Sequence, residues 1–221
     1  HLVVTEGNDE GRTGARLLDS SDTELAASAE CPGVHGETVA GEETVVLGCE
    51  DGVLILHGDH FHKVASPDAY GRIGNQFGTE TSTVVLGDYK TDPEGTLSSV
   101  SLIDTEAETY DVVNLGDVEF TWRGAGRGPA GMFYVLATDG AIHEFDPAAS
   151  EFTGDVFPVI DAWEGPDDWQ TPHPGMITAG DIAYVVDVAG ERLVSVDLTT
   201  GDIIAEGEEL PSFPNEIAVN L

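Results

Sequence analysis

Residues that bind metals or form disulfides gather in one stretch of the chain. The segment from Cys31 to His62, CPGVHGETVAGEETVVLGCEDGVLILHGDHFH, holds both cysteines and four of the seven histidines. Neutral imidazole and thiolate groups are ligands that Zn²⁺ prefers in proteins, so a zinc site is first expected here. Three short runs within the segment are rich in apolar residues and bounded by Gly, Asp or Glu, which is typical of antiparallel strands with histidines at their ends.

The two cysteines allow two kinds of chemistry. Cys31 and Cys49 lack C-x-x-C spacing, which makes them a poor zinc knuckle, and they flank one strand hairpin. A disulfide closing a loop of this length contributes about 3 kcal/mol in the loop-entropy model. The pattern therefore favours a disulfide over metal ligation. A disulfide in turn indicates an oxidising compartment, such as a periplasm or the cell exterior.

The run His57-Gly58-Asp59-His60-Phe61-His62 forms a second candidate metal site. If Gly58 and Asp59 make a hairpin turn, His57 and His60 flank it, and His62 points to the same face as His60. Two imidazoles at this spacing on a strand can share a zinc ion with a carboxylate such as Asp59. The alternative is an exposed outer hairpin whose polar residues bind nothing.

One pattern recurs along the whole chain and must position these residues: a short apolar strand, a Gly or Asp turn, and a further strand ending in aspartate. Equivalent positions recur about 40 to 50 residues apart, which is the length of a β-propeller blade. These positions are Val45, Val84, Tyr134 and Tyr184. We therefore expect an all-β fold, a β-propeller of four-stranded antiparallel blades with about five blades visible, rather than an open β-sandwich.

The two ends of the chain fit the same pattern. Residues 2–28 are expected to be the second, third and fourth strands of a blade that lacks its first, and residues 214–221 to be a first strand that completes it. Residues 1–221 would then form a single β-propeller domain, since all-β domains of about 200 to 250 residues are common as single units. The alternative is that the chain is the C-terminal portion of a larger ring.

The blade pattern indicates which residues face the central channel. The innermost strand of each blade lines the channel, and the loop leading into it carries ligand-facing residues. Alignment of the repeats places His35, Gly74 and Pro174 at corresponding positions, with His173 one residue before Pro174. His35 is therefore a candidate metal ligand at the axis. His173 is a weaker candidate, because Pro172 and Pro174 indicate a rigid loop that aims its ring differently.

The charge balance excludes two kinds of partner. The chain has 42 Asp and Glu against 8 Lys and Arg, a net charge of -34. Such a surface repels nucleic acids and anionic membranes. No apolar run approaches the roughly 18 residues of a membrane-spanning helix, so membrane insertion is not expected. The carboxylates are interpreted as a solubilising coat that also attracts divalent cations at low ionic strength.

Sequence signatures of common enzyme classes are missing. The chain contains no G-x-S-x-G elbow, no H-E-x-x-H motif and no P-loop. This favours a non-enzymatic metal-binding protein. Two other classes stay open: a lactonase-like propeller hydrolase that uses a channel metal to polarise a carbonyl, and a metal-free protein-binding scaffold.

Two motifs carry a resemblance to a known family. Cys31-Pro32-Gly33-Val34-His35-Gly36-Glu37, followed by Gly48-Cys49-Glu50-Asp51-Gly52-Val53-Leu54 and a closing FPNEIAV, is similar to the AztD-type zinc metallochaperones. The similarity runs through most of the chain, and its specific part is the pair of motifs around the two cysteines.

The resemblance implies a fold, a cargo, a partner and a location. AztD-type proteins are periplasmic or secreted β-propellers that pass Zn²⁺ to the solute-binding protein of a zinc ABC importer. Carried over to this chain, the family pattern makes His35 a zinc ligand and Cys31 with Cys49 a disulfide. Family members are longer, and they carry further histidine ligands before the region matched here. Two alternatives follow: either this chain lacks a complete high-affinity site, or His57, His60 and His62 form a separate one.

Overall fold

The computed structural model of the chain describes residues 1–41, 43–207, 210, 214 and 216–219. The chain divides into two compact units, each of them built from antiparallel sheets. The N-terminal unit comprises residues 1–95 and 99–114, and the C-terminal unit comprises residues 96–98 and 115–221. No helix among the described residues is long and apolar enough to cross a membrane.

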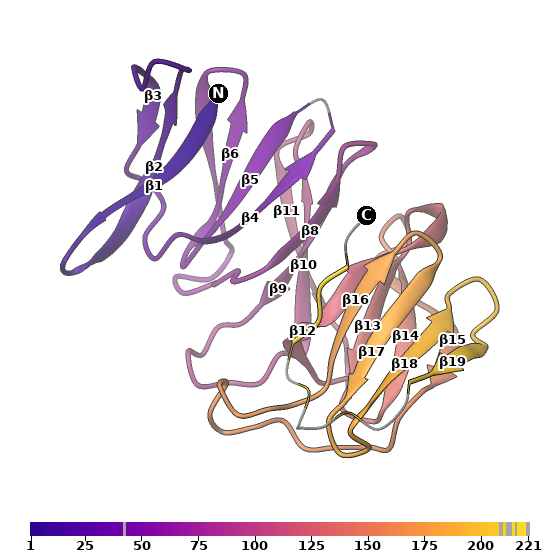
Figure 1. Ribbon diagram of the computed structural model, residues 1–221. Helices are drawn as coiled ribbons and strands as arrows, with labels where there is room; N and C mark the ends of the chain where they lie inside the picture. Colours follow the sequence, from indigo (N-terminus) through magenta and orange to yellow (C-terminus); the bar gives the residue numbers. More distant parts are fainter. Residues whose placement is uncertain (42, 208–209, 211–213, 215, 220–221) are drawn as a thin grey trace. The chain divides into compact units, whose positions relative to one another are not determined.

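The N-terminal unit contains three sheets in which every strand pairs with its neighbour in the sequence (Figure 1). The first has the order β1-β2-β3, the second β4-β5-β6-β7 and the third β11-β10-β9-β8. Their bounds are β1 Leu2–Asn8, β2 Gly11–Leu18, β3 Glu24–Ser28, β4 His35–Ala40, β5 Thr44–Cys49, β6 Gly52–His57, β7 His60–Ala65, β8 Gln76–Thr79, β9 Ser82–Tyr89, β10 Ser99–Asp104 and β11 Thr109–Asn114.

The C-terminal unit contains two four-stranded sheets of the same design, in the orders β12-β13-β14-β15 and β16-β17-β18-β19. Their bounds are β12 Phe120–Arg127, β13 Phe133–Ala137, β14 Ala141–Asp146, β15 Glu151–Pro158, β16 Gly175–Ala179, β17 Ile182–Asp187, β18 Arg192–Asp197 and β19 Ile203–Glu206. A single turn of 3-10 helix, η1, spans Pro129–Gly131.

The middle strands of the second sheet are buried on both faces. In β5 and β6 nearly every residue is buried, whereas the outer strand β7 alternates between exposed and half-buried positions. A strand covered on both faces reads as a continuous apolar run, and a strand at the margin alternates. Sheets pack on either side of Thr44–Cys49 and Gly52–His57, which explains the apolar runs in these two sequences.

The core consists of layers between neighbouring sheets. Between the first and second sheets lie Ala15, Val34, Leu47 and Leu54, together with both cysteines. Between the second and third sheets lie Val46, Ile55, Val85 and Ile103 among others. In the C-terminal unit a corresponding layer joins Tyr134, Leu136 and Ile142 to Val185, Val194 and Leu198. Face-to-face packing of small twisted sheets is the packing of propeller blades.

The predicted all-β propeller design is confirmed at the level of the individual sheets. Val45, Val84, Tyr134 and Tyr184 lie in β5, β9, β13 and β17, which are the second strands of the four complete blades. Residues 2–28 form a three-stranded sheet, as expected for a blade lacking its first strand.

The expected completing strand, residues 214–221, is not observed as a strand. Pro214 and residues 216–219 belong to no strand, and residues 215, 220 and 221 lie outside the described residues. Completion of the first blade by this segment therefore stays a prediction, as does the reading of residues 1–221 as a single domain.

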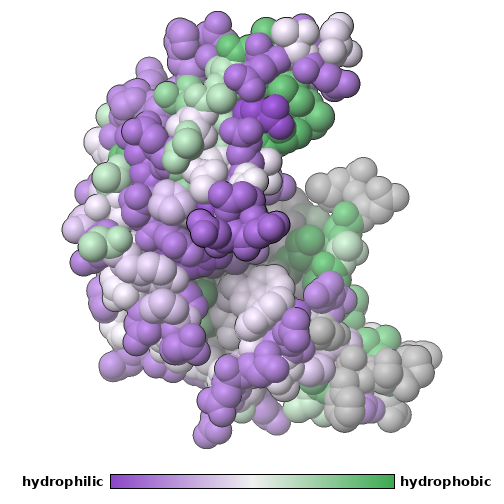
Figure 2. All heavy atoms as spheres, turned by 90° about the vertical axis from the view of Figure 1, so that its left-hand side faces the viewer, coloured by the Kyte–Doolittle hydropathy of each residue, from purple (hydrophilic) through white to green (hydrophobic). Residues whose placement is uncertain are grey.

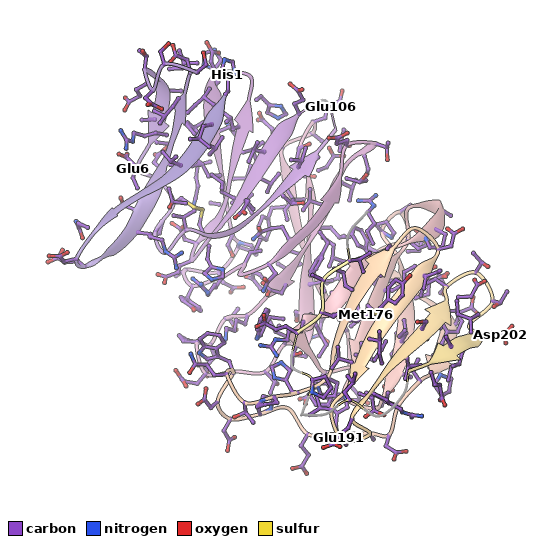
Figure 3. All side chains as sticks on the ribbon, in the orientation of Figure 1. His1, Glu6, Glu106, Met176, Glu191 and Asp202 are labelled. Atoms are coloured by element: carbon purple, nitrogen blue, oxygen red, sulfur yellow. A yellow bond between two sulfur atoms is a disulfide. The ribbon has the colours of Figure 1, made fainter. Side chains whose placement is uncertain are left out.

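Many acidic side chains lie on the outside of the sheets, although Asp88 and Asp187 are buried. On the face drawn in Figure 2 hydrophilic residues predominate, with smaller apolar groups between them. The exposed turns between strands carry many of the carboxylates, among them the labelled Glu106, Glu191 and Asp202 (Figure 3). This distribution agrees with a solubilising coat.

Candidate metal centre

His35 is the first residue of β4, the innermost strand of its blade, and its side chain is exposed. Its Nδ1 lies 2.9 Å from the carbonyl oxygen of Gly74. A carbonyl oxygen only accepts hydrogen bonds, so Nδ1 carries the proton and donates it. In the neutral ring Nε2 then keeps its lone pair. No hydrogen bond from the described residues involves Nε2. A ring with one nitrogen bonded to a backbone carbonyl and the other left for a metal is the usual arrangement of a metal-binding histidine.

The residues around His35 allow the second and third blades to approach closely. Gly36 has a φ of +69°, and a Cβ added to it would overlap the carbonyl oxygen of Gly74. Gly48 pairs with His35 across β4 and β5, and a Cβ at this position would overlap the side chain of Gln76. Glycine at positions 36 and 48 is therefore what permits His35 to reach Gly74.

The loop that contains Gly74 is fastened to a buried carboxylate. Asp88 in β9 is only 5% exposed. Its Oδ1 accepts the backbone N–H of Gly74 at 2.6 Å and of Asn75 at 3.1 Å, and its Oδ2 accepts the Asn75 amide at 2.8 Å. Burial raises the pKa of the Asp88 carboxyl, while these hydrogen bonds and the Arg72 guanidinium oppose that rise.

The predicted disulfide is present. Cys31 and Cys49 are bonded, with their Cα atoms 5.0 Å apart, and neither is exposed. The loop that follows Cys31 is also tied to the strand end by the Glu50 N–H, which donates to the Pro32 carbonyl at 2.9 Å. The disulfide thus fixes the loop that leads directly into His35.

The predicted hairpin of the histidine-rich run is also present, since β6 ends at His57 and β7 begins at His60, with a φ of +58° at Gly58. His57, however, uses both ring nitrogens inside the protein. Its Nε2 donates to the Thr105 carbonyl at 2.9 Å, and its Nδ1 accepts the Thr44 hydroxyl at 3.0 Å. In this arrangement His57 has no lone pair for a metal, and it ties the second blade to the third.

His60 and His62 differ from His57 in being accessible. The His60 side chain is 87% exposed, with Nε2 at 3.4 Å from Oδ1 of Asp59. The Nε2 of His62 lies 3.2 Å from Oε2 of Glu108. Residues two apart on a strand share a face, as predicted for this pair. Glu108 lies in the turn between β10 and β11, and no local sequence pattern associates it with His62.

The structure places the two histidine groups at opposite ends of one sheet. His35 pairs with Gly48 near the end of β5, whereas the hairpin at residues 57–60 lies beyond the start of that strand. About five residues of strand separate the two ends, or roughly 16 Å. Among the described residues no three His, Cys, Asp or Glu side chains group closely enough to hold a metal ion.

His173, in the C-terminal unit, lies in a different environment. It is 3% exposed and lies two residues before β16, separated from that strand by Pro174. Its Nδ1 donates to the Thr171 carbonyl at 2.7 Å, and its buried Nε2 has no hydrogen-bond partner among the described residues. Its ring stacks on Trp163 and meets the edge of Trp122, whose ring in turn contacts Trp169.

Burial lowers the pKa of His173, and the nearby positive charge of Arg123 lowers it further. The ring is therefore neutral at pH 7. No sequence pattern indicated that Trp122 and Trp163 would contact this histidine, because one lies in β12 and the other in a long loop. His143, by contrast, pairs with Asp139 at 2.9 Å within its own blade.

Comparisons with known proteins identify relatives in fold. No protein-family model and no curated protein sequence matches the chain. Among solved structures, apo AztD from Citrobacter koseri superposes with a TM-score of 0.78 at 22% identity, over 96% of this chain and 58% of that one. A second structure of Citrobacter koseri AztD gives a TM-score of 0.75 at 21% identity, over 96% and 57%.

A chain of the mitotic checkpoint complex also superposes, with a TM-score of 0.55 at 12% identity, over 89% of this chain and 58% of that one. This chain therefore spans less than two thirds of the length of each of these proteins. At such identities the likeness establishes a shared propeller-like fold. It agrees with the fold expected from the resemblance of the two cysteine motifs.

Proposed function

We propose that this chain binds Zn²⁺ outside the cytoplasm and passes it to the solute-binding protein of a zinc ABC importer. The observation that carries the proposal is the state of His35, an exposed imidazole held by its Nδ1 with its Nε2 lone pair free. The AztD-like fold and the cysteine motifs give that imidazole a context in which zinc is the expected cargo.

His35 would contribute one ligand, with Zn²⁺ about 2.0 to 2.1 Å from Nε2. The described residues provide no group of three ligands, so water and donors from a partner protein would occupy other coordination positions. A zinc ion that is partly open to water can exchange ligands with an acceptor protein. The role proposed is therefore binding and transfer, without catalysis.

The charge of the chain would assist loading of the ion. With a net charge of -34 the surface attracts divalent cations, and the attraction weakens as salt screens it beyond about 8 Å at physiological ionic strength. Zinc loading should also weaken as the pH falls, because a protonated imidazole has no lone pair for zinc.

The hairpin would hold a separate and weaker site. His60 and His62 share one face of β7 and already lie near the carboxylates of Asp59 and Glu108. Both side chains are accessible, and neither is fixed in the way that Gly74 fixes His35. His57 is left out of this site because both of its nitrogens are engaged.

The disulfide supports a location in the periplasm or outside the cell. Cys31 and Cys49 are bonded and fully buried. Structural disulfides form and persist in oxidising compartments and are rare in the cytosol. A zinc carrier in such a compartment would meet the solute-binding protein of an importer directly.

Equilibrium dialysis against Zn²⁺ and Ca²⁺ tests the binding part of the proposal. The variants are His35→Ala and, as matched controls on exposed histidines of the same blade, His60→Ala and His62→Ala. We expect zinc to be preferred over calcium, the tightest zinc ion to be lost in His35→Ala, and the controls to lose only the weaker one. Zinc binding that is unchanged in His35→Ala would refute the central site.

A transfer assay tests the delivery part. The zinc-loaded chain is mixed with a purified apo solute-binding protein of a zinc ABC importer, and the metal content of each is measured after separation. Direct transfer predicts that the rate rises with acceptor concentration. A rate equal to that of spontaneous zinc release would instead indicate that the ion passes through solution.

A further inference from the structure

A buried carboxylate lies behind His35, joined to it by an unbroken series of hydrogen bonds. Asp88 accepts the Gly74 N–H at 2.6 Å, and the carbonyl of the same Gly74 accepts the His35 Nδ1–H at 2.9 Å. Two further bonds from Asn75 complete the set around Asp88. The carboxylate has no contact with the exposed nitrogen of His35, so any effect on a metal must pass through the loop.

Apart from the Asp88 side chain, the turn is held by the Asp88 backbone N–H, which donates to the Asn75 carbonyl at 3.1 Å. Gly74 comes between Ile73, whose N–H bonds to the Cys49 carbonyl, and β8, which begins at Gln76. The Gln76 Nε2 lies 3.5 Å from the His35 carbonyl, a marginal hydrogen bond. The position of the Gly74 carbonyl therefore depends mainly on Asp88, which gathers three N–H groups of the turn onto its two oxygens.

We propose that Asp88 is a positioning residue for His35: by holding the Gly74–Asn75 turn it fixes the carbonyl that keeps the His35 proton on Nδ1 and leaves Nε2 to a metal. The effect on zinc rests on the proposed function, whereas the effect on the His35 proton does not. Partners in the outer shell of a metal ligand set its tautomer and ring orientation, and their loss costs about 10 to 100-fold in metal affinity.

The geometry is specific to this blade. Asp187, in the C-terminal unit, is similarly buried at 6% exposure and also holds a turn, through the Gly190 N–H and the Arg192 Nε, both at 2.9 Å. No histidine ring is bonded to that turn. A substitution at Asp187 therefore reproduces the loss of a buried, turn-holding carboxylate without the connection to His35, which makes it a matched control.

The experiment compares Asp88→Asn and Asp187→Asn in the full chain. Asparagine keeps the size of the side chain but has a single acceptor oxygen, so it cannot accept all three N–H groups on two oxygens as Asp88 does. The first measurement is the tautomer of His35 in the zinc-free protein, taken from ¹⁵N chemical shifts of its ring nitrogens and assigned by the signals missing in His35→Ala. The second is the dissociation constant for Zn²⁺ by chelator competition.

We expect the Nδ1–H tautomer in the parent chain and in Asp187→Asn. In Asp88→Asn we expect a shift toward the Nε2–H tautomer and a zinc affinity about 10 to 100-fold lower. An unchanged tautomer in Asp88→Asn, or an Nε2–H tautomer in the parent chain, would overturn the proposal. A shifted tautomer with unchanged zinc affinity would overturn its connection to the metal.

If Asp88→Asn does not fold, as circular dichroism would reveal, a second variant takes its place. Asn75→Ala removes one of the three bonds to Asp88 and leaves the two backbone bonds in place, so a smaller shift in the same direction is expected. No shift there would also overturn the proposal. If instead His35→Ala leaves zinc binding intact, the proposed function fails, while the tautomer measurement still decides whether Asp88 positions His35.

Discussion

Reduction of the disulfide should destabilise the N-terminal unit by about 3 kcal/mol. Cys31 and Cys49 are separated by 18 positions. Cross-linking a loop of this length lowers the entropy of the unfolded chain by an amount worth about 3 kcal/mol at 25 °C. Both cysteines are fully buried, and reduction leaves the two sulfur atoms in place, so the comparison measures the cross-link without a large change in packing.

The assay is urea unfolding followed by far-ultraviolet circular dichroism. The protein is unfolded, reduced and refolded in reductant, and then compared with the oxidised protein. Tryptophan fluorescence is unsuitable as the probe because Trp122, Trp163 and Trp169 all belong to the C-terminal unit. The variant Cys31→Ala/Cys49→Ala serves as the control, since reductant should not change its stability.

The expected loss of free energy of unfolding on reduction of the disulfide has a definite size. A loss of free energy of unfolding near 3 kcal/mol, with a lower urea midpoint, agrees with a cross-link that acts on the unfolded chain. A loss below about 1 kcal/mol would refute it, because the same loop would then be held closed in the unfolded chain without the bond. A change of equal size in the double-alanine control would show that the reductant acts elsewhere.

Three further outcomes are expected. His57→Ala should lower the free energy of unfolding by about 2 kcal/mol, because it removes two half-buried hydrogen bonds, whereas His60→Ala should change it by less than about 0.5 kcal/mol. Urea titration measures both values. Burial lowers the pKa of His173, so the unfolded chain binds a proton at this residue more readily than the folded chain does. The contribution of His173 to stability is therefore complete above pH 6.5 and should be lost as the pH drops through the pKa of the folded state. His173→Phe should flatten that part of the profile of stability against pH, which tryptophan fluorescence measures. In Gly48→Ala the added Cβ would overlap the Gln76 side chain, so the zinc affinity should fall, as chelator competition would show. A fully wild-type zinc affinity would argue against this close packing of Gln76 on Gly48.

The sequence was sufficient to predict the blades because their signal is local. Thr44–Cys49 and Gly52–His57 are apolar runs separated by a turn, and the same pattern recurs in each later blade. The missing first strand of the opening sheet could be predicted for the same reason. The disulfide could also be predicted, since the spacing of the two cysteines and the motifs around them both indicated it.

Partners from distant parts of the chain were not predictable. The sequence predicts His57 as a metal ligand beside His60, and no local pattern indicates the bond of its ring to the Thr105 carbonyl in the next blade. Asp88 reads as one acidic residue among 42, and only the fold places it beneath the loop that orients His35. These interactions join residues through the packing of neighbouring sheets, which a single sequence does not encode in any local pattern.

Anomalous diffraction at the zinc edge, from crystals of the zinc-loaded chain, tests the central claim most directly. The account predicts a zinc peak about 2.0 to 2.1 Å from Nε2 of His35, with Nδ1 still bonded to the Gly74 carbonyl. A zinc peak confined to His60 and His62, with none at His35, would contradict it.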